Sequence, residues 1–260
     1  MHVSNTTDFV NVAGKKIQVM RGGEGPPLVY LHSAGGEMDW TRFHDGLAQN
    51  FSVIAPAHPG FALSDGLNTI DDMLDLTWHY VDFFEQLDLH NVPVVGFSLG
   101  GWLAAELAVL RPALVGKLVM VNAAGVRVEG VQMAEWFIDN FDKLRKLLVY
   151  DPESPVAFEV VPKQPDETQL LMFLRAREAT ARVGWNPYLH NPKLPSHLHR
   201  VQCPTLLICG RQDRLIPPEH SKFYAEKIPG AKLEILDNCG HMLPYEKTED
   251  FVRLTTAFCK

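Results

Sequence analysis

The sequence has little of what several large classes of protein require. It contains only 4 cysteines among 260 residues, and no two of them form a C-x₂-C pair. Cys203 and Cys209 lie in one apolar run, where free thiols behave as small hydrophobic side chains. We therefore expect reduced thiols and a cytoplasmic protein.

Long apolar runs and an excess of positive charge are also missing. No run approaches the roughly 20 apolar residues that a membrane-spanning helix needs. The stretch MHVSNTTDFVNV has no basic region followed by an apolar one, so we expect no signal peptide. The formal net charge of −7 disfavours nucleic acid, because phosphate binding needs a basic face. We expect a small-molecule substrate and no membrane insertion, while the oligomeric state is left without a prediction.

What is present is typical of one large α/β domain with an insertion. Hydrophobic residues make up 46% of the chain and charged residues 21%, as in ordinary globular proteins that bury a core. Strand-like runs alternate with helical patterns along most of the sequence. The expected strands cover residues 8–12, 15–22, 27–32, 52–57, 92–97, 117–122, 204–210 and 232–237. The expected helices cover residues 38–50, 69–88, 100–112, 218–228 and 248–259.

The order of these runs predicts the sheet. Residues 8–12 and 15–22 follow each other through Ala13-Gly14, a pair that is typical of a hairpin turn. From Pro27 onward the strands are short, continuously apolar and separated by helices. That pattern is typical of parallel strands buried on both faces of a sheet.

The alternation stops between residues 126 and 196. Residues 131–151 and 168–185 have a helical period, and a Pro-rich stretch, 151–167, joins them. No strand of the main sheet is evident there, and the strand pattern resumes at residue 204. We therefore predict an all-helical cap at 126–196, inserted into a core domain made of residues 1–125 and 197–260.

One motif points to chemistry. Residues 96–100 read G-x-S-x-G between an expected strand and an expected helix. A tight turn there strains the backbone at Ser98 and leaves no room for side chains two residues before and after it. The Ser98 Oγ then projects at a helix N-terminus, where the dipole and the free Leu99 N–H favour developing negative charge. The spacing predicts a nucleophile at Ser98.

A serine nucleophile needs a base, and the base needs an orienting carboxylate, here expected in the order serine, acid, histidine. His241 lies in a loop between the last expected strand and the last helix, where sites of open α/β sheets gather. Asp213 follows the strand at 204–210 and is the leading acid, with Asp237 and Glu129 as alternatives. Other histidines after Ser98 belong to the insertion or its exit and are expected at the surface: His190, His197 and His199.

Two backbone N–H groups should hold the developing oxyanion. Leu99 is the first expected donor. The second should come from the loop after residues 27–32, whose small residues let its backbone approach a substrate. Ala34 is the first choice there and Ser33 the second.

The motifs VYLHSAGG, VIAPAHPGFALSD, VVGFSLGGWLAAELA, LLICGRQDRLIPP and DNCGHMLPYEKTEDF follow one another over nearly the whole chain. Together they make the chain resemble the α/β-hydrolase superfamily. The resemblance implies a mostly parallel eight-stranded sheet, a helical lid after the sixth strand, a Ser98–His241–Asp213 triad and no cofactor; no metal site is predicted. The chain departs from its relatives in two places. His32-Ser33 stands where they usually have His-Gly, and Ala57-His58 where they often have Asp.

The function expected from these residues is hydrolysis of a small, largely apolar carboxylic ester through an acyl-enzyme on Ser98. Ser98 argues against relatives that use an Asp nucleophile, whereas cofactor-free perhydrolases share the triad, so peracid formation stays open as a side activity. Carbon–carbon hydrolases of ring-cleavage products are the alternative, although they often carry Asn before the serine and Trp after the histidine, where Phe97 and Met242 stand here. A ligand-binding or receptor protein on the same fold is an alternative of another class.

The cap is expected to roof the pocket. Its aromatic and thioether side chains favour an apolar acyl or aromatic group in the substrate. Arginines on the second cap helix could hold a substrate carboxylate, as carbon–carbon hydrolases require: Arg175, Arg177 and Arg182. The predicted substrate-binding residues are His32, Trp102, Trp136, Phe137, Phe173, Arg175, Trp185 and Met242.

Overall fold

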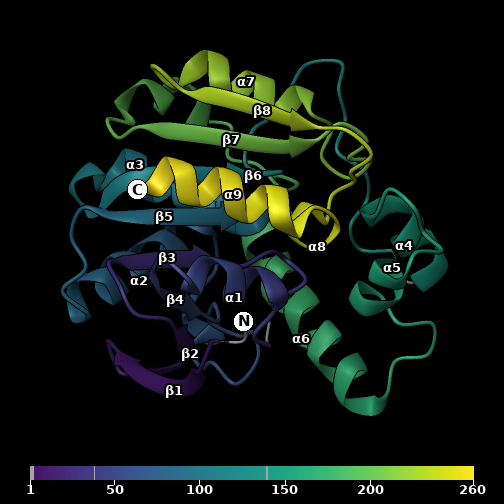
Figure 1. Cartoon of the computed structure of the whole chain (residues 1–260), viewed down its shortest axis with the longest axis horizontal. Coiled ribbons are helices and arrows are strands. Elements are labelled where there is room, and N and C mark those ends of the chain that lie inside the picture. The colour runs from purple at the N-terminus through teal and green to yellow at the C-terminus, as the bar shows by residue number, and fades with distance from the viewer. Residues whose placement is uncertain (1–2, 38, 139) are drawn as a thin grey trace.

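The computed structural model describes residues 3–37, 39–138 and 140–260. Its centre is an 8-stranded sheet with the strand order β1-β2-β4-β3-β5-β6-β7-β8 (Figure 1). The strands are β1 (Asn5–Val12), β2 (Lys15–Gly22), β3 (Pro27–Leu31), β4 (Ser52–Pro56), β5 (Val92–Phe97), β6 (Val115–Val121), β7 (Thr205–Gly210) and β8 (Lys232–Leu236). The β1–β2 and β2–β4 pairs are antiparallel and the remaining pairs are parallel. The prediction of a mostly parallel eight-stranded sheet is confirmed.

Local sequence explains both parts of this sheet. At the antiparallel edge, Ala13 and Gly14 have φ of 48° and 84°, the left-handed values of a two-residue hairpin turn. That turn sets the register in which Val12 lies opposite Lys15. In the parallel part, every residue of β7 is buried, because helices cover both faces of the sheet.

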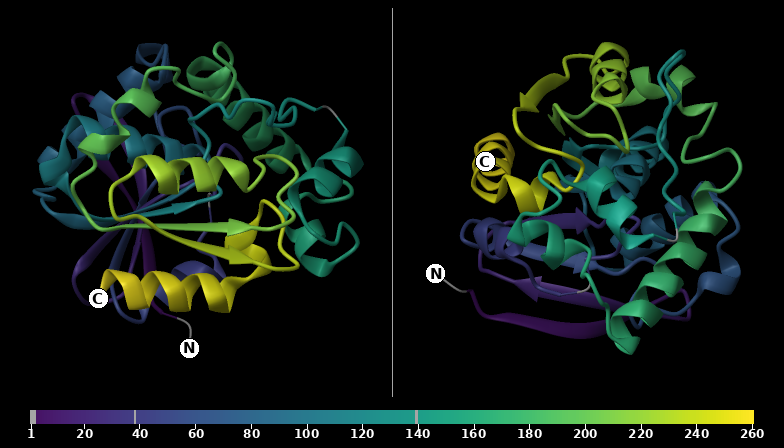
Figure 2. Two further views of the ribbon diagram at one scale, coloured as in Figure 1. Left: turned by 90° about the horizontal axis from the view of Figure 1, so that it is seen from above. Right: turned by 90° about the vertical axis from the view of Figure 1, so that its right-hand side faces the viewer.

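The helices of the core lie in two layers. Figure 2 shows α1 (Arg42–Ala48) and α9 (Thr248–Cys259) on one face, and α2 (Met73–Gln86), α3 (Leu99–Leu110) and α7 (Glu219–Lys227) on the other. A short helix, α8 (Leu243–Glu246), leads into α9. The expected helix at 38–50 begins only at Arg42, where the Thr41 side chain caps it; Met38 lies outside the described residues.

The chain between β6 and β7 forms helices beyond the carboxyl ends of the strands (Figure 1). These are α4 (Phe141–Leu148), α5 (Pro155–Val160) and α6 (Glu167–Gly184). The two short helices η3 (Leu194–Ser196) and η4 (Leu198–Arg200) follow and lead the chain back to the start of β7. The expected helix at 168–185 is present as α6. The extent of the cap, 126–196, stays a prediction.

Two expectations for this segment are wrong. Residues 131–138 are not helical, because Ala134 N–H donates to Leu215 O and Trp136 N–H donates to the Tyr188 hydroxyl. These contacts with other parts of the chain replace the bonds of a helix, which begins at Phe141 with Asn140 as its cap; residue 139 lies outside the described residues. The Pro-rich stretch expected only to join two helices contains α5, which is capped by Ser154 and has a proline at its first position.

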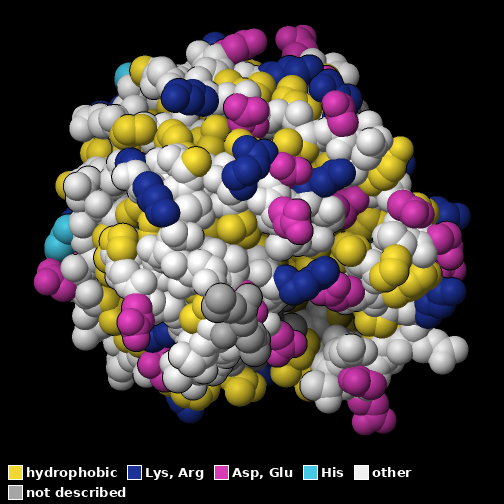
Figure 3. Space-filling view, viewed as in Figure 1, with side chains coloured by type: hydrophobic (Ala, Val, Ile, Leu, Met, Phe, Trp, Pro, Cys, Tyr) yellow, Lys and Arg dark blue, Asp and Glu magenta, His cyan; other side chains and the backbone are white. Residues whose placement is uncertain are grey.

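The face of the molecule in Figure 3 carries both charged and apolar side chains. No helix of the described ranges is long and apolar enough to cross a membrane. On the face in Figure 3, acidic and basic side chains are interspersed. The excess of acidic residues behind the net charge of −7 therefore does not gather in one area of that face.

Candidate active site

Ser98 occupies a strained turn between β5 and α3. Its φ of 55° and ψ of −111° lie outside the regions that L-residues prefer. The turn requires glycine on both sides. A Cβ on Gly96 would lie 2.2 Å from Gly100 O, and one on Gly100 would lie 2.0 Å from Leu31 O. The G-x-S-x-G spacing is thus a steric condition for presenting Ser98 at the start of α3.

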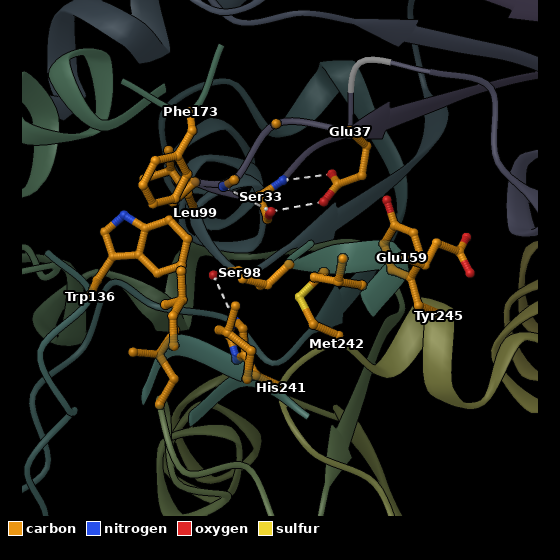
Figure 4. A pocket seen from close by; sticks show the side chains of 18 of the residues that line it. Ser33, Glu37, Ser98, Leu99, Trp136, Glu159, Phe173, His241, Met242 and Tyr245 are labelled. Atoms are coloured by element: carbon orange, nitrogen blue, oxygen red, sulfur yellow. Dashed lines mark hydrogen bonds between the residues drawn. The ribbon is translucent and has the colours of Figure 1, made fainter. Parts of the chain in front are cut away.

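Ser98, His241 and Asp213 come together from the ends of three strands. His241 Nε2 lies 3.0 Å from Ser98 Oγ, and His241 Nδ1 lies 2.7 Å from Asp213 Oδ2. The Asp213 carboxylate can only accept a hydrogen bond, so the neutral imidazole carries its hydrogen on Nδ1 and donates it to Oδ2. Nε2 then accepts a hydrogen bond from the Ser98 hydroxyl (Figure 4). The Asp213 side chain has no exposed surface, and that of His241 is 3% exposed. This arrangement lets His241 remove the Ser98 proton.

The loops that carry His241 and Asp213 are held by backbone contacts. Asp213 Oδ1 accepts the N–H groups of Leu215 at 2.9 Å and Ile216 at 2.8 Å, which fixes the carboxylate plane. His241 N–H donates to Leu148 O of α4 at 2.7 Å, so the segment after β6 supports the histidine loop.

The structure does not bring the two alternative acids to His241. Asp237 forms an ion pair with Arg211, and both side chains are more than half exposed. Glu129 is exposed on the segment after β6. Of the three carboxylates considered, only Asp213 contacts the imidazole.

The two first-choice oxyanion donors line one cavity. Neither Leu99 N–H nor Ala34 N–H donates a hydrogen bond to another residue of the described ranges, and both residues line the cavity beside Ser98. The second choice for this donor, the Ser33 N–H, is wrong. This N–H donates to Glu37 Oε2 at 2.9 Å, so it is not available to a substrate.

The cavity that holds Ser98 and His241 has a volume of about 450 Å³. In Figure 4, Trp136 and Phe173 lie on one side of Ser98, whereas Glu37, Glu159 and Tyr245 lie on the other. Apolar residues form much of the wall: Ala124, Trp136, Leu144, Leu148, Val160, Val161, Phe173, Leu189, Leu215 and Met242. The cavity thus has a long apolar wall and a polar end.

Comparison with known proteins agrees with this geometry. Residues 28–254 match the model of the alpha/beta hydrolase family. This chain belongs to the alpha/beta hydrolase family. It is similar to the 2-hydroxy-6-oxononadienedioate/2-hydroxy-6-oxononatrienedioate hydrolase 2 of Pseudomonas putida, with 29% identity over 91% of this chain and 88% of the relative. The corresponding hydrolase of Comamonas testosteroni is 25% identical over 99% of this chain and 98% of its own.

Solved structures of other hydrolases have the same fold. A serine hydrolase involved in carbazole degradation superposes with a TM-score of 0.80, at 25% identity over 98% of each chain. A meta-cleavage product hydrolase from Pseudomonas fluorescens has a TM-score of 0.78, at 24% identity over 96% of each chain. The second likeness supports the fold alone.

In this α/β-hydrolase, Trp136, Phe173 and Met242 line the cavity as predicted, but five other predicted substrate-binding residues do not. Trp102 is buried in the core, where its indole N–H donates to Glu106 Oε1 at 2.9 Å. Phe137 packs against Trp185 with ring centroids 5.1 Å apart, and Trp185 is 62% exposed. These side chains serve packing or face solvent.

His32 is the fourth of these corrections. It is buried, and both ring nitrogens are engaged: Nδ1 lies 2.7 Å from Ser33 O and Nε2 accepts the His58 N–H at 2.8 Å. Burial lowers the pKa of His32 to about 4. A substrate cannot reach this ring, which belongs to the support of the loop at 33–37.

Arg175 is the fifth correction, and the other two cap arginines, Arg177 and Arg182, are engaged outside the cavity. Arg175 follows Phe173 by two residues on α6, about 200° around the helix, so it points away from the cavity. Arg177 donates to the carbonyl of Trp136 at 3.1 Å, and Arg182 pairs with Asp71 at 3.1 Å. Arg177 and Arg182 thus tie α6 to neighbouring segments.

Two residues of the site had no motif to reveal them. Glu37 is buried, lines the cavity and accepts both the N–H and the hydroxyl of Ser33. Burial raises the pKa of Glu37, and the Ser33 bonds oppose that shift. Asn122 donates to His241 O at 2.6 Å and accepts Gly210 N–H at 3.0 Å, which ties the histidine loop to the end of β7. A polar residue directly after a buried strand was the available signal for Asn122, and Asp213 follows its own strand three residues later.

Proposed function

We propose that this α/β-hydrolase cleaves a small, largely apolar carboxylic ester through an acyl-enzyme on Ser98. The observation that carries the proposal is the position of His241, hydrogen-bonded to Ser98 Oγ at 3.0 Å and to Asp213 Oδ2 at 2.7 Å. A hydroxyl, an imidazole and a carboxylate in this order form the triad of acyl-transfer enzymes.

The reaction proceeds in two halves. Ser98 Oγ attacks the ester carbonyl carbon while its proton passes to His241 Nε2. The carbonyl oxygen becomes an oxyanion held by the N–H groups of Leu99 and Ala34, and Asp213 stabilises the imidazolium. When the C–O bond breaks, His241 gives the proton to the leaving alcohol. Water then attacks the acyl-enzyme by the same route and regenerates the Ser98 hydroxyl.

The charge of the cavity favours a neutral substrate. Three carboxylates line it, Glu37, Asp39 and Glu159. Arg42 is the one Lys or Arg among the described lining residues, and it pairs with Glu159 at 3.0 Å. An anionic substrate would therefore meet more negative than positive charge at this end of the cavity.

Hydrolysis of a carbon–carbon bond is the second candidate. The names of the Pseudomonas putida and Comamonas testosteroni relatives favour it, since both denote hydrolases of a dienedioate or trienedioate. The same serine, histidine and oxyanion donors would serve that reaction. The acidic lining of the cavity is the reason for placing the ester first.

The deciding experiment compares wild type with Ser98→Ala. A fluorophosphonate probe would report an activated serine, and p-nitrophenyl acetate, butyrate and octanoate would report ester turnover. A 2-hydroxy-6-oxo-6-phenylhexa-2,4-dienoate assay would report carbon–carbon cleavage. We expect labelling and ester turnover in wild type and neither in the variant. Labelling with turnover of the dienoate alone would transfer the assignment to the second candidate, and an unlabelled wild type that binds ligands without turnover would favour a receptor.

A further inference from the structure

A buried group of three side chains lies behind the oxyanion loop and takes no part in the mechanism above. His32 follows β3, His58 follows β4, and Tyr80 lies on α2. None of the three is more than 3% exposed. The two imidazole rings stack with centroids 3.6 Å apart, and Tyr80 Oη lies 2.5 Å from His58 Nδ1.

The hydrogen bonds of this group allow one placement of the protons. The His58 backbone N–H can only donate, so His32 Nε2 accepts it at 2.8 Å and the ring hydrogen of His32 sits on Nδ1. His32 O can only accept, so His58 Nε2 carries the second ring hydrogen and donates to it at 3.0 Å. His58 Nδ1 must then accept from the Tyr80 hydroxyl. Burial holds both imidazoles neutral, because it lowers the pKa of His32 to about 4 and that of His58 well below its usual value.

This chain of bonds ends at the peptide that carries the second oxyanion donor. His32 Nδ1–H donates to Ser33 O at 2.7 Å, and Gly36 N–H reaches the same oxygen at 3.1 Å. Ser33 O and Ala34 N–H belong to one peptide, and in a trans peptide they point in opposite directions. Holding the oxygen on the protein side therefore turns the Ala34 N–H toward the cavity that Ala34 lines.

The same group touches the nucleophile turn. A Cβ on Gly100 would lie 2.6 Å from His32 O, the oxygen that accepts from His58. His58 thus holds both the ring and the carbonyl of His32, between the Ser98 turn and the oxyanion loop.

We propose that His58 and Tyr80 are positioning residues for the hydrolysis: through His32 they aim the Ala34 N–H at the oxyanion. The inference rests on the proposed function. Because the oxyanion exists in the transition state and not in bound substrate, a misdirected donor lowers kcat and leaves KM nearly unchanged.

The first test is Tyr80→Phe, which removes one hydroxyl and keeps the ring. We expect kcat for p-nitrophenyl butyrate to fall about 10- to 100-fold with KM within about twofold, since losing an oxyanion donor costs about 100- to 1,000-fold. Inhibition by a trifluoromethyl ketone, whose serine adduct bears an oxyanion, should weaken by a similar factor. Thr77→Val is the matched control, because it also deletes a buried hydroxyl on α2, one that donates to Met73 O at 2.7 Å, and its kcat should match wild type.

A second pair of variants separates aiming from packing. In His58→Gln the amide N–H occupies the Nε2 position and retains the donor to His32 O, whereas in His58→Asn the amide reaches only the Nδ1 position. We expect His58→Gln to retain at least about tenfold more kcat than His58→Asn at equal thermal stability. Equal kcat in the two, or wild-type kcat and ketone inhibition in Tyr80→Phe, would overturn the inference while wild-type esterase activity upheld the proposed function. A wild type that the fluorophosphonate does not label would overturn both.

Discussion

Asp213→Asn should inactivate the enzyme by shifting the ring hydrogen of His241 from Nδ1 to Nε2. Asp213 Oδ1 accepts two backbone N–H groups, those of Leu215 and Ile216, at 2.9 and 2.8 Å. An asparagine must keep its carbonyl oxygen there, so its NH₂ group faces His241 Nδ1. That nitrogen then has to accept, the ring hydrogen moves to Nε2, and the imidazole presents a donor to Ser98 where a base is needed.

The size of the effect follows from this reversal. In a serine triad the wrong tautomer lowers kcat by about 10⁴-fold, or about 5 kcal/mol in the activation free energy. The variant keeps both backbone hydrogen bonds and its volume, so the free energy of unfolding should change by less than about 1 kcal/mol. A large loss of kcat with little loss of stability is the expected signature.

The assay is the steady-state hydrolysis of p-nitrophenyl butyrate, with the Ser98→Ala protein giving the background. Asp237→Asn is the matched control, because that carboxylate pairs with Arg211 at the surface and should leave kcat unchanged. Retention of more than about a tenth of wild-type kcat in Asp213→Asn would refute the reasoning. Loss of activity in Asp237→Asn instead would show that the acid had been assigned to the wrong residue.

Three further predictions concern stability and specificity. Burial lowers the pKa of His32 to about 4 and that of His44 to about 3. Between these values and pH 6.5 the unfolded chain therefore binds more protons than the folded protein, which favours unfolding as the pH falls. In urea unfolding, each of the two histidines should lower the free energy of unfolding by about 2 kcal/mol at pH 5 relative to pH 7.5. A pH-independent unfolding free energy over that range would contradict it. Glu37→Leu leaves the buried Ser33 N–H without its acceptor and should cost about 2 kcal/mol in the same measurement, whereas a cost below about 0.5 kcal/mol would mean that another group replaces the carboxylate. Trp136→Ala removes an indole from the cavity wall and should raise the octanoate-to-acetate ratio of kcat/KM about tenfold; an unchanged ratio would place the acyl chain elsewhere.

Much of the fold could be read along the chain, because each signal was local. Continuous apolar runs marked the parallel strands, and glycines two residues before and after Ser98 marked the turn between β5 and α3. The helical period gave a wrong prediction where distant segments supplied the hydrogen-bond partners of the backbone. Residues 131–138 have a helical period, but Leu215 O and the Tyr188 hydroxyl take the N–H groups that a helix would use.

The sequence by itself determined that a nucleophile turn exists, that His241 follows a late strand and that the elements form an α/β sheet. Only the tertiary structure decided which carboxylate faces His241, because Asp213 and Asp237 both follow strands and differ in what lies opposite them. It also decided that two groups expected in the site are not available to a substrate. The Ser33 N–H is bound by Glu37, four residues further along the same loop, once that loop folds back on itself. The His32 ring is enclosed by His58, which comes from the loop after another strand. Hydrogen bonds between distant segments depend on how the strands are ordered in space, and that order is not written in any short stretch of the chain.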